Sequence, residues 1–365
     1  MRIIHIITTI ELGGAEKQLA IIAKAQVEFG HVVEVVYLKG DSHLADTLQQ
    51  SGIKVHFSVA KAPWIYKLKA LKKILKSKPD VVHAHLPASE FIAALAILEI
   101  PLIISRHNTE RLLSESFSFF SKLLARFIEY RATFCIAITD TVRNFMLNKG
   151  EWRNPKTIFT VLYAFDPNLI PSPIIQNRTE PTRFLTISRL VPQKDIPTLL
   201  RAYASFCNED QHSELSIIGS GPEILKLQKL SQTLGIGKRI SWLGKTAQTA
   251  QAIGQSDLFV LTSKYEGFGL VLLEAMALGR PILAAANPAV KEVLGDKYPG
   301  LFNIGDHREL CLLMLRARNF AFRKELVTYL HNRLNLFELS KSIQETNLVY
   351  VNSITRTRDS KTENK

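Results

Sequence analysis

Cysteine is scarce in this chain of 365 residues, which has only Cys135, Cys207 and Cys311. So few thiols exclude a disulfide-rich scaffold, and no two of them are close enough in sequence to form a zinc knuckle. We therefore expect a protein of a reducing compartment, the cytoplasm.

Long apolar runs are also missing. The longest, from Phe91 to Ile104, is interrupted by Glu99 and Pro101 and is too short to cross a bilayer. The first residues, MRIIHIITTIELGG, include charged and polar side chains and no small-residue cleavage site. We interpret them as a first β-strand rather than a signal peptide.

Two motifs are absent. No G-x-G-x-x-G follows the first predicted strand, which argues against a dinucleotide-dependent dehydrogenase. No Asp-x-Asp occurs anywhere in the chain, so we expect no catalytic metal.

Acidic residues are outnumbered by basic ones, and the net charge is +13. Residues 1–173 hold 21 basic and 15 acidic side chains, and residues 174–365 hold 25 and 18, so the excess is +6 and +7. Because the charge is spread over both halves, it argues against a single nucleic-acid-binding domain. It suits an anionic small molecule, an anionic membrane, or both.

Short apolar runs alternate with longer helical patterns throughout the chain. Near-continuous apolar strands are typical of parallel sheets covered on both faces. The first series has strands at 32–38, 80–84, 101–105 and 134–138, with helices at 14–29, 64–77, 88–98, 116–130 and 140–149. The second has strands at 183–187, 215–218, 239–243, 257–261 and 281–286. The pattern predicts an α/β fold with two Rossmann-like, doubly wound domains.

The proline-rich, aperiodic segment 166–182 separates the two series and reads as a linker. We therefore predict an N-terminal domain at 1–165 and a C-terminal domain at 183–335. A helix at 336–355 is expected to pack back on the N-terminal domain, and 356–365 is expected to be a disordered tail.

The segment SKYEGFGLVLLEAMALGRPIL, residues 263–283, has the most specific pattern. A strand ends, a Gly-Phe-Gly turn follows Glu266, and a helix opens near Leu270. The N–H groups at a helix start bind anions, and glycine lets a diphosphate approach the backbone. Glu274, about one turn inside the helix, can accept hydrogen bonds from a ribose diol. The alternative is an ordinary β-α unit with surface glutamates.

The loop SRLVPQKD, residues 188–195, places Arg189 and Lys194 between a strand and a helix. A guanidinium fork and an ammonium point charge suit a phosphate. Asp195 could cap the following helix. The alternative is a solvated basic loop.

His83 and His85 end a predicted strand, and residues two apart in a strand point the same way. A metal pair is conceivable, but the sequence offers no third ligand. His107 follows the next strand, where a buried or capping histidine is the alternative to a functional one.

With these motifs the sequence resembles the retaining GT-B glycosyltransferases, specifically glycosyltransferase family 4, over nearly its whole length. The resemblance implies two domains facing a cleft and a nucleotide-diphosphate sugar as co-substrate, with a UDP-sugar favoured over a GDP-sugar. It implies no metal and no other cofactor. It implies that the diphosphate is bound by Arg189, Lys194, Gly267, Phe268, Gly269 and Leu270, and the ribose by Glu274. It places His107 and Glu266 at the reacting sugar, and assigns Gly219, Gly221, Leu243 and Gly244 to the nucleotide and Gly13 and Gly14 to a cleft loop.

The sequence departs from the family pattern at two places. Tyr163-Ala164 stands where the family usually has Asn-Gly, and Asn287-Pro288-Ala289 replaces a glycine-rich stretch. The second difference bears on the shape of the donor-sugar pocket, so the sugar is left open.

Segment 61–79 has seven lysines and no acidic residue. As a helix it forms a stripe of Trp64, Leu68, Leu71 and Leu75 beside Lys69, Lys72, Lys73 and Lys76, which would suit an anionic membrane surface. Alternatively, the stripe packs on the sheet and the lysines are solvated. The Phe-rich segment 117–128 has the same two interpretations, a membrane-facing edge or part of the core.

A peripheral position on the inner face of the cell membrane and a glycan or lipid-linked acceptor follow from the first reading, with surface polysaccharide assembly as the setting and no nucleic-acid partner. Two other functions stay open: a nucleotide-sugar epimerase on the same architecture, and a non-catalytic sugar-nucleotide binder. Release of free nucleotide in the presence of an acceptor separates the transferase from both.

Overall fold

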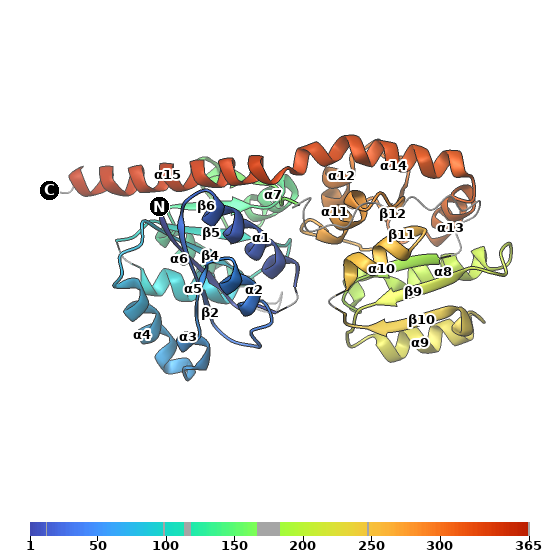
Figure 1. Ribbon diagram of the computed structural model, residues 1–365, viewed down its shortest axis with the longest axis horizontal. Helices are drawn as coiled ribbons and strands as arrows, with labels where there is room; N and C mark the ends of the chain where they lie inside the picture. Colours follow the sequence, from blue (N-terminus) through green and yellow to red (C-terminus); the bar gives the residue numbers. More distant parts are fainter. Residues whose placement is uncertain (12, 98, 113–117, 166–182, 247, 364–365) are drawn as a thin grey trace. The chain divides into compact units, whose positions relative to one another are not determined.

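The computed structural model describes residues 1–11, 13–97, 99–112, 118–165, 183–246 and 248–363. The chain divides into two compact units (Figure 1). The N-terminal unit comprises Met1–Ala164 and Phe337–Lys365, and the C-terminal unit comprises Phe165–Leu336. The predicted linker, 166–182, lies outside the described residues.

The N-terminal unit is built on a parallel sheet with strand order β3-β2-β1-β4-β5-β6-β7 among the described residues. The order reverses between β1 and β4, the kind of switch point at which open α/β sheets bind ligands. The strands are β1 Arg2–Ile7, β2 Val32–Tyr37, β3 Lys54–His56, β4 Val81–His85, β5 Leu102–Arg106, β6 Phe134–Ala137 and β7 Ile158–Thr160.

Helices cover both faces of this sheet. Two of them, α1 and α2, share one face with the C-terminal helix α15, while α4, α5 and α6 pack against one another on the other (Figure 1). The helices are α1 Gly14–Glu28, α2 Ala45–Gln50, α3 Ser58–Lys61, α4 Trp64–Leu75, α5 Pro87–Ala96, α6 Ser118–Arg131, α7 Asp140–Asn148, the short 3₁₀ turn η2 Pro155–Thr157, and α15 Leu339–Glu363.

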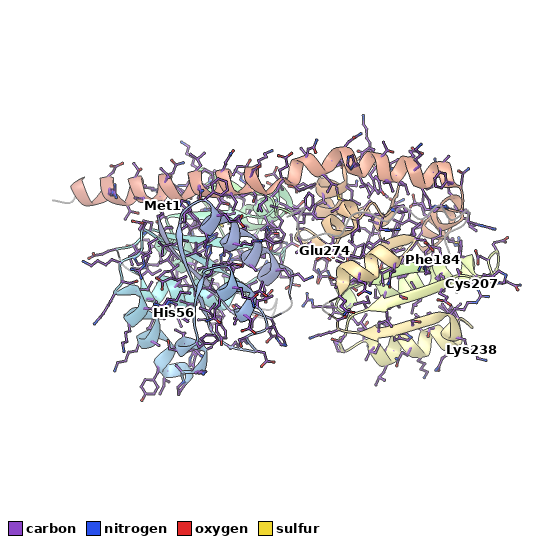
Figure 2. All side chains as sticks on the ribbon, viewed as in Figure 1. Met1, His56, Phe184, Cys207, Lys238 and Glu274 are labelled. Atoms are coloured by element: carbon purple, nitrogen blue, oxygen red, sulfur yellow. The ribbon has the colours of Figure 1, made fainter. Side chains whose placement is uncertain are left out.

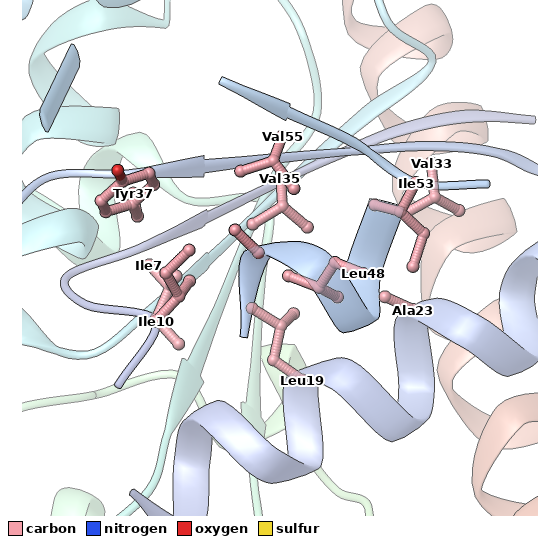
Figure 3. Close-up of a cluster of buried hydrophobic side chains, with 11 residues drawn as sticks. Ile7, Ile10, Leu19, Ala23, Val33, Val35, Tyr37, Leu48, Ile53 and Val55 are labelled. Carbon is pink, nitrogen blue, oxygen red and sulfur yellow. The ribbon is translucent and has the colours of Figure 1, made fainter. Parts of the chain in front are cut away.

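Apolar side chains from alternate strand positions form the core under α1 and α2. Figure 3 shows Leu19 and Ala23 of α1 and Leu48 of α2 against Ile7 and Val35 of the strands. Burying each such side chain contributes about 1.5–3 kcal/mol. This core fixes the sheet whose carboxyl edge carries the predicted site residues.

The C-terminal helix α15 belongs to the N-terminal unit and lies along it (red in Figure 1). Val349 and Tyr350 are buried against the sheet, and the Ser342 hydroxyl donates to the Leu162 carbonyl at 3.0 Å. The helix continues to Glu363, where we expected a disordered tail. Extending an existing helix adds one hydrogen bond per residue, and the Arg356 guanidinium lies 5.4 Å from the centre of the Phe134 ring.

The C-terminal unit has a second parallel sheet, with order β10-β9-β8-β11-β12-β13 in the described residues. Its switch point lies between β8 and β11. The strands are β8 Arg183–Ile187, β9 Glu214–Ile218, β10 Ile240–Gly244, β11 Leu258–Leu261, β12 Ile282–Ala285 and β13 Leu301–Phe302. The helical elements are η4 Pro192–Lys194, α8 Ile196–Phe206, α9 Ile224–Thr233, η5 Gly237–Arg239, α10 Thr249–Gln255, α11 Leu270–Ala277, α12 Pro288–Leu294, α13 His307–Arg316, α14 Phe320–Leu334 and η6 Asn335–Phe337.

The predicted fold class is confirmed: both units are parallel α/β structures. Sequence analysis missed β3, β7 and β13, which have only two or three residues and thus no readable periodicity. Among the described residues, we find no helix with both the length and the hydropathy needed to cross a bilayer.

Candidate active site

Loops after β8, β9 and β10 meet at the carboxyl edge of the C-terminal sheet. The Leu190 amide donates to the Ser220 carbonyl at 2.9 Å, and the Gly219 amide donates to the Gly244 carbonyl at 2.7 Å. A Cβ atom on Gly219 or Gly221 would overlap the backbone of the loop after β8, so only glycine permits this approach. The three predicted loops are therefore neighbours, with no side chain between them at these glycines.

An ion pair joins the loop after β8 to the loop after β11. The Lys194 ammonium donates to the Glu266 carboxylate at 2.5 Å, and the two side chains are 13% and 8% exposed. The Gln193 amide donates to the Tyr265 carbonyl at 2.8 Å and strengthens the connection. Lys194 is therefore not the solvated side chain of the alternative interpretation, because the pair covers most of it.

Arg189 and Asp195 flank this pair in sequence. Arg189 is exposed, and its guanidinium donates to the Gln193 side-chain oxygen at 3.4 Å. The sequence suggested that Asp195 caps α8, but its side chain makes no capping hydrogen bond to the backbone of that helix. Its residue adopts a left-handed conformation, with φ of 47°, and its carboxylate accepts from the Thr198 hydroxyl at 2.8 Å.

The helix α11 begins at Leu270, as predicted. Gly269 before it is left-handed, with φ of 87°, a conformation that favours glycine, and Phe268 is buried. The start of α11 lies directly after this turn, and the backbone dipoles of a helix favour an anion at its start. Glu274 lies one turn further along α11 (Figure 2) and is half-buried.

The glycine loop of the N-terminal unit, Gly13-Gly14, leads from β1 into α1 without a left-handed turn at either glycine. Gly13 is extended, with φ of −108° and ψ of 167°, and Gly14 is the first residue of α1. A Cβ on Gly13 would overlap the carboxylate of Glu16, which accepts from the Thr9 hydroxyl at 2.6 Å. A Cβ at this position would therefore displace the Glu16 carboxylate, whereas the backbone conformation of Gly13 is open to any residue.

His107 directly follows β5, and both of its ring nitrogens have partners. Nδ1 lies 2.5 Å from the Tyr163 hydroxyl, and Nε2 lies 3.2 Å from Nδ1 of His85. Burial, together with the charge of Arg106, lowers the pKa of His107 to about 3. The ring is therefore neutral at physiological pH. Tyr163, one of the departures from the family pattern, contacts the predicted catalytic histidine directly.

Comparison with known proteins assigns both halves of the chain. Residues 12–159 match the family described as Glycosyltransferase Family 4, and residues 172–306 match Glycosyl transferases group 1. Each half of the chain thus matches a glycosyltransferase domain family.

Individual relatives agree with this assignment. The chain is 32% identical over 34% of its length to alpha-monoglucosyldiacylglycerol synthase of Streptococcus pneumoniae, and 36% identical over 33% of its length to N-acetyl-alpha-D-glucosaminyl L-malate synthase of Bacillus anthracis. The matches span only 28% and 32% of those two relatives. The superposition on the crystal structure of Anabaena HepE covers 96% of this chain and all of the HepE chain, with a TM-score of 0.81 and 20% sequence identity. That similarity shows the GT-B fold.

The second departure from the family pattern, Asn287, has a structural explanation. Its side chain is fully buried, accepts from the Val290 amide at 3.1 Å as the N-cap of α12, and donates to the Ser263 carbonyl at 2.9 Å. Asn287 therefore ties the start of α12 to the strand end that precedes the Glu266 loop. The predicted nucleotide contact Leu243, on the edge strand β10, is 53% exposed.

Sequence reasoning missed the third member of the histidine cluster. His5 of β1 pairs in register with His83 of β4, and ring nitrogens of His5, His83 and His85 lie within 4.8 Å of one another. A signal was present in the sequence, because the first strand, RIIHII, carries His5, and the strand VVHAH carries His83 and His85 at alternate positions. All six nitrogens already have hydrogen-bond partners, so a metal ion would have to displace several of them.

Proposed function

We propose that this glycosyltransferase transfers a sugar from a nucleotide-diphosphate sugar to a glycan or lipid-linked acceptor, with retention of anomeric configuration. The observation that carries the proposal is the contact of Lys194 with Glu266 beside the start of α11. It places a cation and a carboxylate beside a helix N-terminus at the carboxyl edge of one sheet. Such an edge is where α/β folds bind nucleotides.

In this proposal the C-terminal unit binds the donor. Lys194, Arg189 and the amides at the start of α11 stabilise charge on the departing diphosphate, so no metal ion is needed. Glu274 accepts hydrogen bonds from the ribose hydroxyls, and Glu266 faces the sugar. A uridine donor is supported by the HepE crystal structures, which contain UDP, glucose and UDP-glucose.

The N-terminal unit binds the acceptor, with His107 and the Gly13-Gly14 loop near the reacting carbon. The acceptor oxygen attacks the anomeric carbon from the face that the diphosphate leaves. The bond from that carbon to the phosphate oxygen breaks, and the same phosphate oxygen takes the acceptor proton. A transferase is favoured over an epimerase because both domain matches are to glycosyltransferases.

Replacement of Lys194 by alanine is expected to weaken UDP binding and sugar transfer about 10- to 100-fold, because a charge-assisted hydrogen bond contributes about 1.5–3 kcal/mol. UDP and GDP affinities are measured by calorimetry, and nucleotide release from UDP- and GDP-sugars is measured with and without EDTA. Lys194→Arg keeps the charge and should retain part of the binding.

The matched control is Lys226→Ala, because Lys226 also pairs with a glutamate, Glu223, at 3.0 Å but on an exposed helix. It should bind UDP as the unmodified protein does. Unchanged UDP affinity in Lys194→Ala would contradict the assignment of the donor site, and loss of turnover in EDTA that magnesium restores would contradict metal independence.

A lipid-linked acceptor is supported by the surface of the N-terminal unit. The predicted stripe on α4 is divided: Leu71 and Leu75 are buried in the unit, whereas Trp64 is 64% exposed next to Ile65 and Tyr66. The seven lysines are divided too. Lys67 is buried, and its ammonium donates to backbone carbonyls of Leu38, Val59 and Ala60.

The remaining lysines of 61–79 are exposed, and α6 adds exposed Phe119, Phe120 and Leu123. Each helix thus has a buried face and an exposed apolar one, and the exposed face supports the membrane alternative. We propose that the exposed faces place the enzyme peripherally on the cytoplasmic side of an anionic membrane. The Streptococcus relative, named for synthesis of a glucosyl diacylglycerol, supports a lipid acceptor.

Sedimentation with anionic vesicles is expected to carry down the protein at low salt and release it at high salt. Each exposed lysine near the surface contributes about 1 kcal/mol, and salt screens this attraction. Replacing Lys69, Lys72, Lys73 and Lys76 by glutamine should abolish most of the binding. Replacing Lys226, Lys229 and Lys238 of the other unit should not. Equal, negligible binding to anionic and neutral vesicles would favour a soluble acceptor.

A further inference from the structure

A continuous chain of hydrogen-bonded side chains runs through the N-terminal unit from the predicted catalytic histidine to the C-terminal helix. It passes between the sheet and the layer of α1 and α15. Its links are Tyr163–His107 at 2.5 Å, His107–His85 at 3.2 Å, His85–His5 at 3.0 Å, His5–Gln26 at 2.8 Å, Gln26–Tyr350 at 3.3 Å, Tyr350–His83 at 2.7 Å and His83–Ser105 at 2.7 Å.

The amide of Gln26 determines where the protons of this chain lie. Its side-chain oxygen can only accept, so Nε2 of His5 carries the proton of that ring. A neutral imidazole has one N–H, so Nδ1 of His5 accepts from Nε2 of His85. By the same reasoning, Nδ1 of His85 accepts from Nε2 of His107, whose own Nδ1 accepts from Tyr163.

The other end of the chain follows the same direction. The Gln26 side-chain nitrogen donates to the Tyr350 hydroxyl, which donates to Nδ1 of His83. Nε2 of His83 then donates to the Ser105 hydroxyl. Every donor points from Tyr163 toward Ser105, and each imidazole is neutral because burial lowers the pKa of all four histidines.

We propose that Gln26 and Tyr350 are positioning residues that fix this proton order and so hold His107 in one tautomer, with its proton on Nε2. If the Gln26 amide turned over, its nitrogen would face His5, and the donors of all the rings would reverse. The Tyr350 hydroxyl couples that turn to His83, because it accepts from the amide nitrogen and donates to Nδ1 of His83, so the amide, the hydroxyl and the His83 ring would have to reverse together. Only the importance of His107 for transfer rests on the function proposed above.

The consequence for the reaction is that the His107 imidazole has both nitrogens engaged within its own unit. It is a neutral, oriented ring that does not exchange a proton with the acceptor, in agreement with a phosphate oxygen as the proton acceptor. The structure thereby makes the C-terminal helix, through Tyr350, part of the support of the active site.

Nitrogen NMR of protein labelled with ¹⁵N-histidine tests the proposal, because protonated and unprotonated ring nitrogens have separate shifts and couple to different ring protons. The His107 signals are assigned with a His107→Gln variant. We expect a single tautomer, protonated on Nε2, in the unmodified protein. We expect a mixture or the opposite tautomer in Tyr350→Phe. Tyr298→Phe, which removes a buried hydroxyl bonded to Ile282 in the other unit, should leave the His107 signals unchanged.

If Tyr350→Phe does not fold, Gln26→Met removes the amide and has the same expected outcome. His107 protonated on Nδ1 in the unmodified protein, an imidazolium at neutral pH, or zinc bound by the cluster would each overturn the proposal. So would a His107 tautomer that is unchanged in folded Tyr350→Phe and Gln26→Met. These readouts do not depend on sugar transfer. In the transfer assay Tyr350→Phe should lower kcat at least several-fold with KM nearly unchanged.

Discussion

Lowering the pH from 7.5 to 5 is expected to destabilise the N-terminal unit by several kcal/mol, a large part of the stability of a typical domain. The cause is the buried histidine cluster. Burial lowers the pKa of His5 to about 4 and holds the pKa of His83 and His85 well below the usual range. Neighbouring histidines lower the last two further.

The sign follows from proton uptake. The unfolded chain protonates its histidines near pH 6.5, while the folded chain leaves these three neutral. The stability that they contribute is therefore complete above pH 6.5 and is lost as the pH falls toward 4. Each histidine that stays neutral in the folded state lowers the free energy of unfolding by about 2 kcal/mol at pH 5 relative to pH 7.5.

Urea unfolding at several pH values measures this loss, with the fluorescence of buried Trp152 as the probe after Trp64 and Trp242 are replaced by phenylalanine. His43→Gln, which removes an exposed histidine, should leave the pH dependence unchanged. A free energy of unfolding that is the same at pH 7.5 and 5 would show that the cluster is protonated or solvated in the folded state.

Replacing Arg106 by methionine is expected to destabilise the same unit by about 3–5 kcal/mol, because it leaves buried charge without a counter-ion. The Arg106 guanidinium lies 2.9 Å from the Glu151 carboxylate and 3.2 Å from that of Glu90. All three side chains are at most 2% exposed. Burial raises the pKa of Glu90, and the charge of Glu151 raises it further, so without Arg106 both carboxylates are costly.

Urea unfolding at pH 7 checks this prediction against two variants. Glu90→Gln removes a buried charge but keeps a polar group of the same size, and should cost less than Arg106→Met. Lys24→Met breaks an exposed pair with Glu28 and should change stability by no more than about 1 kcal/mol. Similar losses in Arg106→Met and Lys24→Met would mean that the buried cluster is not an ion pair in solution.

The two-domain α/β architecture could be predicted from the sequence because its strands and helices each produce a pattern of apolar residues over a short stretch of chain. Buried parallel strands read as apolar runs, for example 32–38 and 183–187, and the helices between them show their own period. The start of α11 at Leu270 was predictable for the same reason, since a glycine turn after a strand opens a helix. Elements of two or three residues, such as β13, carry no such pattern and were missed.

The contacts of the candidate site could be predicted only in part. The sequence identified Lys194 and Glu266 as separate motifs, but only the strand order, with β8 beside β11, brings them to 2.5 Å. It identified His83 and His85 without a third partner, because pairing of β1 with β4 is a long-range choice.

The sequence by itself determined which residues form strands and helices, because periodicity and turn residues act over a few positions. Only the tertiary structure decided that Tyr350 of the C-terminal helix completes a hydrogen-bonded chain to His107. No local rule links residues so far apart, because Tyr350 can be buried only against a sheet that has already formed. Its buried hydroxyl then needs hydrogen-bond partners, which Gln26 and His83 provide.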